Sequence, residues 1–197
     1  MSTAFLTDLF REKASEEAIV WHGRSYDYAW LSDRIVYWVD RLTSEGIRQG
    51  DVTLLQGDFS PNSVALLLGL IEKSCICVPL NAERIHERDV LADTALVSWI
   101  VEIDEKDSVN INRRQGNQGH ELYDLLRRIG HPGIVFFTSG STGVSKVVVH
   151  DLAKLLSKYV AKRHDLRTLA FLLFDHIGGF DTLFYVLSNG STLVIPE

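Results

Sequence analysis

The pattern of hydrophobic and polar positions changes near Gly50. Before that point, apolar positions in residues 5–10 have helical spacing and predict an opening helix that ends near Ala14. The stretch AIVWHGRSYDY then alternates around a central His-Gly pair, which predicts a hairpin. A second helix is expected from about Asp27, because apolar residues recur after it at i, i+4 and i+7.

Short apolar runs follow, and segments with helical spacing separate them. The runs predict buried strands, because they lack the polar alternate positions of a strand that has one face in water. We expect strands at 52–56, 75–80, 95–103 and 133–138, with helices near 62–73, 83–92 and 121–129. Strands and helices that alternate in this way predict an α/β fold with three layers, in which a mostly parallel sheet has helices on both faces.

The rest of the chain continues the same alternation. Residues 105–120 are polar and rich in Asn, Gln and Gly, and they predict a flexible surface loop. The other expected elements are a strand near Val147, a helix from Leu152 to about Arg163, a strand over 168–174, a helix after Gly179 and a strand over 191–195. A length of 197 residues suits one region with a sizeable core, and two subdomains of about 1–130 and 131–197 are the alternative.

Composition and charge exclude several classes of protein. Apolar residues make up 46% and charged residues 23%, as in ordinary globular proteins. No apolar run approaches the ~20 residues of a membrane span, and charges follow the first apolar residues too closely for a secretion signal. We therefore expect a cytoplasmic protein. The formal net charge of -6 opposes nonspecific binding to nucleic acid or anionic membranes.

The cysteines and histidines give no sign of a disulfide or a metal site. Cys75 and Cys77 are separated by one residue on an expected strand, too close for a relaxed disulfide, and we expect buried thiols. The seven histidines lack the paired spacing that metal sites use.

The main candidate for chemistry is the stretch GIVFFTSGSTGVSKVVVH at 133–150. Small residues and hydroxyls follow an expected buried strand, so they would lie at the carboxyl edge of the sheet, where ligands of α/β folds bind. Small residues let backbone N–H groups approach a phosphate, and Lys146 adds a positive charge. An ordinary polar turn is the alternative. The spacing between the second Gly and the Lys does not fit a Walker loop.

TSGSTGVSK resembles the phosphate-loop signature of the adenylate-forming superfamily, which includes acyl- and aryl-CoA synthetases and peptide-synthetase adenylation domains. Further segments resemble the family in the same order. They are the Gly46-Ile47 to Gly50-Asp51 region after a helix, the segment that ends in Val78-Pro79-Leu80-Asn81, and LLFDHIGGFDTLFYVLSNGSTLVI, which resembles the acid-pocket segment. Together these matches extend over most of the chain.

The resemblance implies that Mg-ATP and a small carboxylic acid give an acyl-adenylate and pyrophosphate, and that coenzyme A or a carrier thiol then accepts the acyl group. The residues it implies for nucleotide binding are Thr138, Ser139, Gly140, Ser141, Thr142, Gly143 and Lys146. The residues it implies for the acid are Phe174, Asp175, His176, Gly178 and Gly179.

The acid-pocket segment has features of two subclasses. His176 followed by Ile-Gly-Gly is closer to the acyl- and aryl-CoA ligases, while Phe174-Asp175 keeps part of the peptide-synthetase pattern. Without the resemblance, a structural role would be the better interpretation of His176.

At two positions the predicted phosphate loop differs from the family's usual sequence. Ser145 stands where the family usually has Pro, and Val147 where it usually has Gly; neither change removes a phosphate donor.

The family's adenine-binding loop, its ribose-binding Asp and the small domain with its catalytic Lys cannot be assigned to these residues. We therefore expect that the chain alone neither adenylates an acid nor binds ATP tightly. One interpretation is the N-terminal piece of a ligase. The alternatives are a partner subunit or noncatalytic binding module that keeps the fold and, further behind, a kinase-like phosphotransferase.

Overall fold

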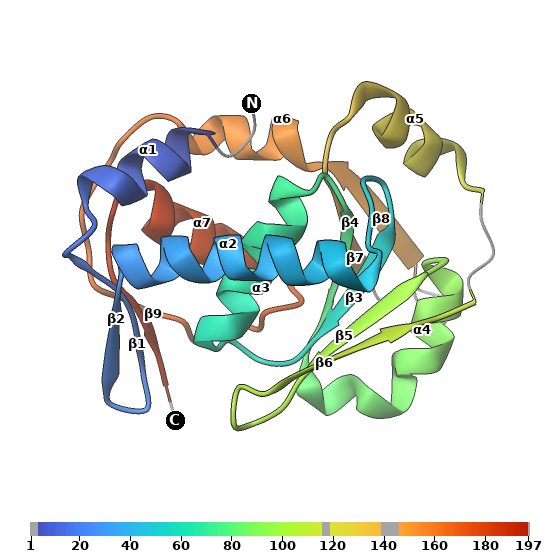
Figure 1. The fold of residues 1–197 in the computed structure, drawn as a ribbon, viewed down its shortest axis with the longest axis horizontal. Helices are drawn as coiled ribbons and strands as arrows, with labels where there is room; N and C mark the ends of the chain where they lie inside the picture. Colours follow the sequence, from blue (N-terminus) through green and yellow to red (C-terminus); the bar gives the residue numbers. More distant parts are fainter. Residues whose placement is uncertain (1–3, 116–118, 139–145, 197) are drawn as a thin grey trace.

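The computed structural model describes residues 4–115, 119–138 and 146–196. Its larger sheet has six strands in the order β6-β5-β3-β4-β7-β8 (Figure 1). These are β3 (Val52–Gln56), β4 (Ile76–Leu80), β5 (Trp99–Ile103), β6 (Val109–Arg113), β7 (Gly133–Thr138) and β8 (Lys146–Asp151). The pairs among β5, β3, β4 and β7 are parallel, whereas the edge strands β6 and β8 are antiparallel to their neighbours. The predicted α/β fold with a mostly parallel sheet is confirmed.

Helices cover both faces of this sheet, as predicted. The helices and helical turns are α1 (Ala4–Glu12), α2 (Tyr28–Glu45), α3 (Pro61–Glu72), η1 (Ala82–Glu87), α4 (Arg88–Thr94), α5 (Glu121–Ile129), α6 (Leu152–Leu156), η2 (Ser157–Tyr159) and α7 (Ile177–Ser188). Successive residues of a strand point to opposite faces of the sheet. Leu54 packs in the core with α4 and α5, and Leu55 packs in the core with α2, α3 and α7. Two buried cores therefore enclose the sheet.

A second, four-stranded sheet joins the two ends of the chain. Its order is β2-β1-β10-β9, and its strands are β1 (Glu17–Trp21), β2 (Arg24–Asp27), β9 (Thr168–Leu169) and β10 (Leu193–Ile195). Strands β1 and β2 form the predicted hairpin, and β10 pairs with β1 in parallel. Figure 1 shows this sheet at the opposite end of the molecule from α4 and α5, with α1 and α2 beside it.

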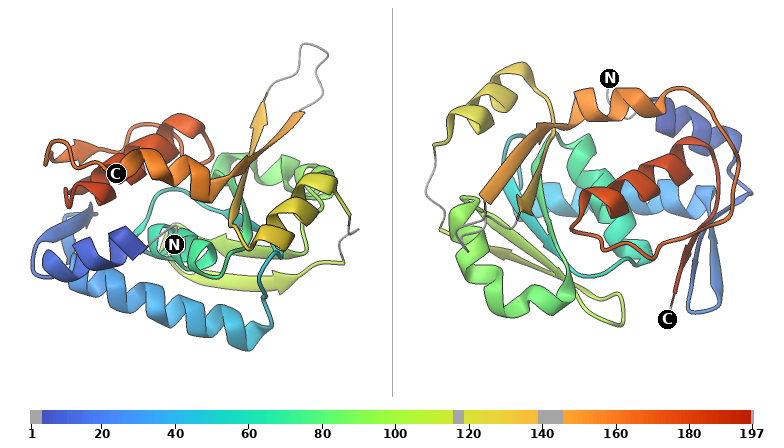
Figure 2. Two further views of the ribbon diagram at one scale, coloured as in Figure 1. Left: turned by 90° about the horizontal axis from the view of Figure 1, so that it is seen from above. Right: turned by 180° about the vertical axis from the view of Figure 1, so that it is seen from behind.

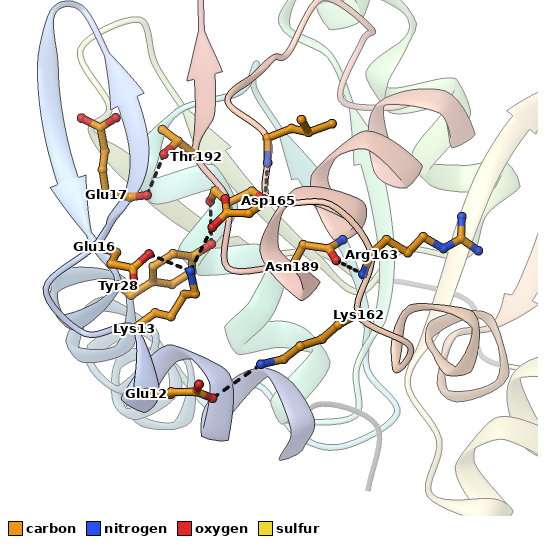
Figure 3. Close-up of polar contacts among 12 residues, drawn as sticks. Glu12, Lys13, Glu16, Glu17, Tyr28, Lys162, Arg163, Asp165, Asn189 and Thr192 are labelled. Atoms are coloured by element: carbon orange, nitrogen blue, oxygen red, sulfur yellow. Dashed lines mark hydrogen bonds and ion pairs between the residues drawn. The ribbon is translucent and has the colours of Figure 1, made fainter.

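A polar junction ties the N-terminal segment to the small sheet's C-terminal part (Figure 3). The Lys13 ammonium lies 2.7 Å from a Glu16 carboxylate oxygen and 3.0 Å from one of Asp165. The buried Tyr28 hydroxyl donates a 2.6 Å hydrogen bond to the carbonyl oxygen of Ser191. Because the Lys13–Asp165 and Tyr28–Ser191 contacts join residues far apart in the sequence, they hold both ends of the chain in one unit.

Some sequence predictions are wrong in extent. Residues 109–113 are not loop but the edge strand β6, since their backbone pairs with β5. The helix predicted to about Arg163 ends with η2, and the Arg163 N–H donates to the Asn189 side chain instead. The strand predicted over 168–174 stops at Leu169, whose carbonyl accepts from the N–H of Phe171 and turns the chain.

Both cysteines are free and buried, as predicted. Burial raises the pKa of the Cys75 thiol to about 12 and raises that of Cys77 well above its ordinary value. Among the helices that the structure describes, none is long and apolar enough to cross a bilayer.

Candidate functional site

The first and last residues of the predicted phosphate-binding segment lie side by side at the ends of two antiparallel strands. Thr138 is the last residue of β7, Lys146 is the first of β8, and the two residues pair across the strands. Figure 2 (left) shows β7 and β8 rising from the body of the molecule. Because β7 runs parallel to β4, Thr138 lies at the carboxyl edge of the sheet, as the sequence predicts. The predicted ligands Ser139, Gly140, Ser141, Thr142 and Gly143 lie outside the described residues.

The predicted acid-pocket segment lies at the start of α7. Phe174 is buried and meets the ring of Phe59 edge to face, with ring centroids 5.1 Å apart. His176 stands at the N-cap position of α7 in an extended conformation, and its side chain is 58% exposed. The segment therefore combines an aromatic anchor in the core with an accessible imidazole.

The two glycines let the first turn of α7 approach the preceding backbone. A Cβ atom on Gly179 would lie 2.1 Å from the carbonyl oxygen of Leu173. On Gly178 it would lie 2.9 Å from the Cδ1 methyl of Leu172. Gly179 thus has a backbone packing role, and this role alone is enough to require a glycine there.

Asp175 is buried between two partners. Its side chain is 1% exposed, and Oδ1 lies 2.9 Å from Nδ1 of His176. The other oxygen, Oδ2, lies 3.6 Å from Nη1 of Arg84 and has no hydrogen-bond partner. A carboxylate that is removed from water in this way is stabilised by the nearby guanidinium charge.

Arg84 brings the two predicted segments together. It lies in η1, just after β4, and its Cζ atom is 5.7 Å from the ring centroid of Phe137, the residue before Thr138. A hydrogen bond to Glu87, and secondarily the charge of Asp175, raise the pKa of the Arg84 guanidinium. The side chain therefore keeps its positive charge beside the C-terminal ends of β4 and β7, which we call the strand exits.

Arg84 was not among the residues that the sequence singled out. Its signal was its position three residues after the end of the Val78–Asn81 segment, at the exit of a buried parallel strand. The Asn81 side chain accepts a hydrogen bond from the Arg84 N–H at 3.1 Å, and this contact starts η1 there. Strand exits in a parallel sheet meet at one edge, so a charged residue at any of them is a candidate for the site.

The donor types at this edge suit an anionic ligand. Thr138 offers a hydroxyl, Lys146 an ammonium group and Arg84 a guanidinium. Among the described residues there is no group of three or more His, Cys, Asp or Glu side chains that could hold a metal ion. Mg²⁺ often binds through substrate phosphates and water, so it could enter with a nucleotide rather than in a protein cage.

Comparisons with known proteins identify the family and the fold of the chain. The family model described as AMP-binding enzyme matches residues 7–197. A hybrid PKS-NRPS synthetase, xenE of Xenoacremonium sinensis, is 27% identical over 194 residues, which cover 89% of this chain and 5% of that protein. HC-toxin synthetase of Cochliobolus carbonum is 27% identical over 222 residues, covering 99% of this chain and 4% of that protein.

Solved structures share the fold. The N-terminal subdomain of Klebsiella oxytoca NpsA, in complex with 3-hydroxyanthranilyl-AMSN, superposes with a TM-score of 0.78 at 16% identity. The match covers 98% of this chain and 52% of that one. The N-terminal domain of FACL13 from Mycobacterium tuberculosis gives a TM-score of 0.76 at 19% identity and covers 98% and 56%. The chain thus spans about half of these solved structures and a small part of the synthetases.

Proposed function

Because this chain belongs to the AMP-binding enzyme family, we propose that it is the N-terminal part of an ATP-dependent ligase that joins a carboxylic acid to coenzyme A or a carrier thiol through an acyl-adenylate. One observation supports this proposal above the others. Arg84 lies near Phe137, the residue before the predicted phosphate loop, and near Asp175 in the predicted acid-pocket segment. These two contacts support the proposal that the phosphate and acid sites are adjacent.

The proposed first step is attack of a carboxylate oxygen of the acid on the α-phosphorus of ATP. The new P–O bond forms as the bond to pyrophosphate breaks, and pyrophosphate leaves with its negative charge. Catalysis of such a step consists mostly of positioning the reactants and stabilising phosphate charge. The acyl group then passes to a thiol, and AMP leaves.

The residues at the strand exits have distinct proposed roles. Lys146 neutralises the β- and γ-phosphates, and Thr138 donates its hydroxyl to a phosphate oxygen, together with the predicted loop ligands Ser139, Gly140, Ser141, Thr142 and Gly143. Mg²⁺, when bound with ATP, supplies further charge neutralisation on the phosphates.

The acid is proposed to bind near the start of α7. Phe174, Asp175, His176, Gly178 and Gly179 shape that side of the site. The exposed imidazole of His176 is the polar group that this segment offers to a substrate, whereas Phe174 and Gly179 fix the backbone. The resemblance of His176 and the residues after it to the acyl- and aryl-CoA ligases favours a fatty or aryl acid as the substrate class.

We further propose that residues 1–197 alone neither adenylate an acid nor bind ATP tightly. The described residues offer hydrogen-bond donors and positive charges for phosphate at the C-terminal ends of β4 and β7. Contacts to adenine and ribose cannot be assigned to them. A site that contacts only the phosphates lacks much of the contact area by which proteins bind a nucleotide, so its affinity for ATP is low.

The test is acid-dependent exchange of labelled pyrophosphate into ATP, measured with a panel of aryl, fatty and amino acids. The protein that contains this chain is compared with residues 1–197 alone. Exchange is expected in the former and not in the latter, and Lys146→Ala is expected to lower it by at least tenfold. Lys154→Ala is the matched control, because that side chain is 81% exposed on α6, away from the strand exits.

The results can contradict each part of the proposal. Exchange by the isolated residues 1–197 would overturn the expected inactivity. Full exchange by Lys146→Ala would remove the assigned role of that lysine. Absence of exchange with every acid, together with a stable complex with another protein in gel filtration, would favour the noncatalytic partner function instead.

A further inference from the structure

We propose that Arg84 and Asp175 are positioning residues for His176: Asp175 holds the imidazole by Nδ1, so that Nε2 faces the substrate and Asp175 itself does not contact it. This inference deepens the proposed function and rests on it, since it assumes that His176 belongs to the acid pocket. It changes the role of Asp175 from a ligand of the acid to a buried support.

The position of the proton follows from hydrogen-bond chemistry. The carboxylate of Asp175 only accepts hydrogen bonds, so at 2.9 Å the proton of the shared bond lies on Nδ1 of His176. A neutral ring then has no proton on Nε2, which is a hydrogen-bond acceptor. The ring is exposed over more than half of its side chain, while its Asp175 partner is buried. The group that Nε2 would bind is therefore a donor on the acid, such as a hydroxyl or amino substituent.

Arg84 is needed because Asp175 is buried. An unpaired buried carboxylate would protonate or turn toward water, and in either case it would cease to be a fixed acceptor for Nδ1. The guanidinium of Arg84 stands 3.6 Å from Oδ2, and its hydrogen bond to Glu87 and its approach to Phe137 fix its position. The order of contacts is therefore Arg84 to Asp175 to His176.

The same geometry restricts the substrate. An ammonium group on the acid would be attracted to an accessible carboxylate, but the Asp175 side chain is 1% exposed and already near a guanidinium. Between Phe174 and Gly179 it is the only carboxylate in the sequence. The segment thus offers an imidazole nitrogen rather than a negative charge to the incoming acid.

The test is the tautomer of His176, read from long-range ¹H–¹⁵N NMR spectra of residues 1–197 at a pH where the ring is neutral. We expect a protonated Nδ1 and an unprotonated Nε2, opposite to the tautomer that an unconstrained imidazole prefers. The signal is assigned by its loss in His176→Gln. His131 is an internal reference, since its Nδ1 lies 3.0 Å from Asp151, away from Arg84.

Variants separate the two support residues. Asp175→Leu is expected to return His176 to the Nε2–H tautomer, and Arg84→Met to shift it in the same direction. Arg84→Lys keeps a positive charge and is expected to retain most of the Nδ1–H form. In each variant an unchanged His131 signal shows that the chain is folded.

Each outcome decides a specific point. An Nε2–H tautomer in the unmodified chain, or an Nδ1–H tautomer that survives in Asp175→Leu, overturns the role of Asp175. An Nδ1–H tautomer of His176 that survives in Arg84→Met overturns the role of Arg84. The readout needs neither ATP nor an acid, so it is distinct from failure of pyrophosphate exchange, which would count against the proposed function alone.

Discussion

A methyl group at Gly179 tests whether the first turn of α7 is fixed by its contact with the preceding backbone. In Gly179→Ala the new Cβ would lie 2.1 Å from the Leu173 carbonyl oxygen, 2.8 Å from its carbonyl carbon and 3.1 Å from the Leu172 carbonyl oxygen. All three neighbours are backbone atoms, which cannot rotate away as a side chain can. The start of α7 must therefore move away from residues 172–173.

The magnitude follows from two opposing effects. Alanine is better than glycine in a helix by up to about 1 kcal/mol, which favours the variant. Overpacking against rigid atoms costs about 1–3 kcal/mol or more. At 2.1 Å the cost lies at the upper end, so we expect a net loss of about 1–2 kcal/mol in the free energy of unfolding. For a chain of this size that lowers Tm by about 2–8 °C.

Gly178→Ala is the matched control. The two glycines are adjacent in the first turn of α7, so the gain in helix propensity is similar. At Gly178 the nearest atom is the Cδ1 methyl of Leu172, at 2.9 Å, the end of a side chain that is 38% exposed and free to rotate. We expect this variant to be neutral or more stable by up to about 1 kcal/mol.

The assay is urea unfolding of residues 1–197 followed by circular dichroism, with the three proteins compared under one set of conditions. The expected order of midpoints is Gly178→Ala at or above the unmodified chain and Gly179→Ala below both. Equal stability of the two variants would refute the backbone contact. A Gly179→Ala protein that is more stable than the unmodified chain would refute it more strongly.

Three further predictions use residues to which no role in nucleotide or acid binding is assigned. Tyr28→Phe leaves the carbonyl of Ser191 without its buried donor, so urea unfolding should show a loss of about 1–3 kcal/mol. Burial raises the pKa of both Cys75 and Cys77, so a thiol reagent such as DTNB should react with them at pH 8 only as fast as the chain unfolds, and rapid labelling of the native chain would contradict this. Burial also raises the pKa of Asp107 above 3.8, so its contribution to stability is present below that pH and is lost as the pH rises through the higher folded value. Asp107→Asn should therefore gain urea stability relative to the unmodified chain between about pH 3 and pH 7, and a constant difference would contradict the shift.

Much of the larger sheet could be predicted because its strands are buried on both faces. The run at 52–56 has no polar alternation that would suit a half-exposed strand, and β3 has these same bounds. The helix predicted over 121–129 also agrees with α5, whose C-cap Gly130 adopts the left-handed conformation that ends a helix. Local sequence patterns are enough to predict an element when its burial and its ends are determined by its own residues.

The errors occur where a distant contact decides the local structure. Residues 109–113 lie in a polar stretch and contain two apolar residues, Val109 and Ile111, yet they form β6 because the edge of β5 offers its backbone groups, and composition alone does not show this pairing. The second sheet was not predicted, since β10 pairs with β1 across most of the chain's length. Two-residue β9 has too little pattern of its own to be distinguished from the turn that follows it.

Arg84 shows the same limit at the candidate site. The sequence predicts a parallel sheet but not its strand order, and the order places the exit of β4 beside that of β7. With this order, Arg84 after β4 and Phe137 near the end of β7 become neighbours, and Asp175 reaches them from the start of α7. Because Arg84 lies 3.6 Å from Asp175 in the acid-pocket segment, its replacement should act first on the acid side of the site. An Arg84→Met protein that loses nucleotide affinity but keeps the His176 tautomer would show that the guanidinium serves the phosphates instead.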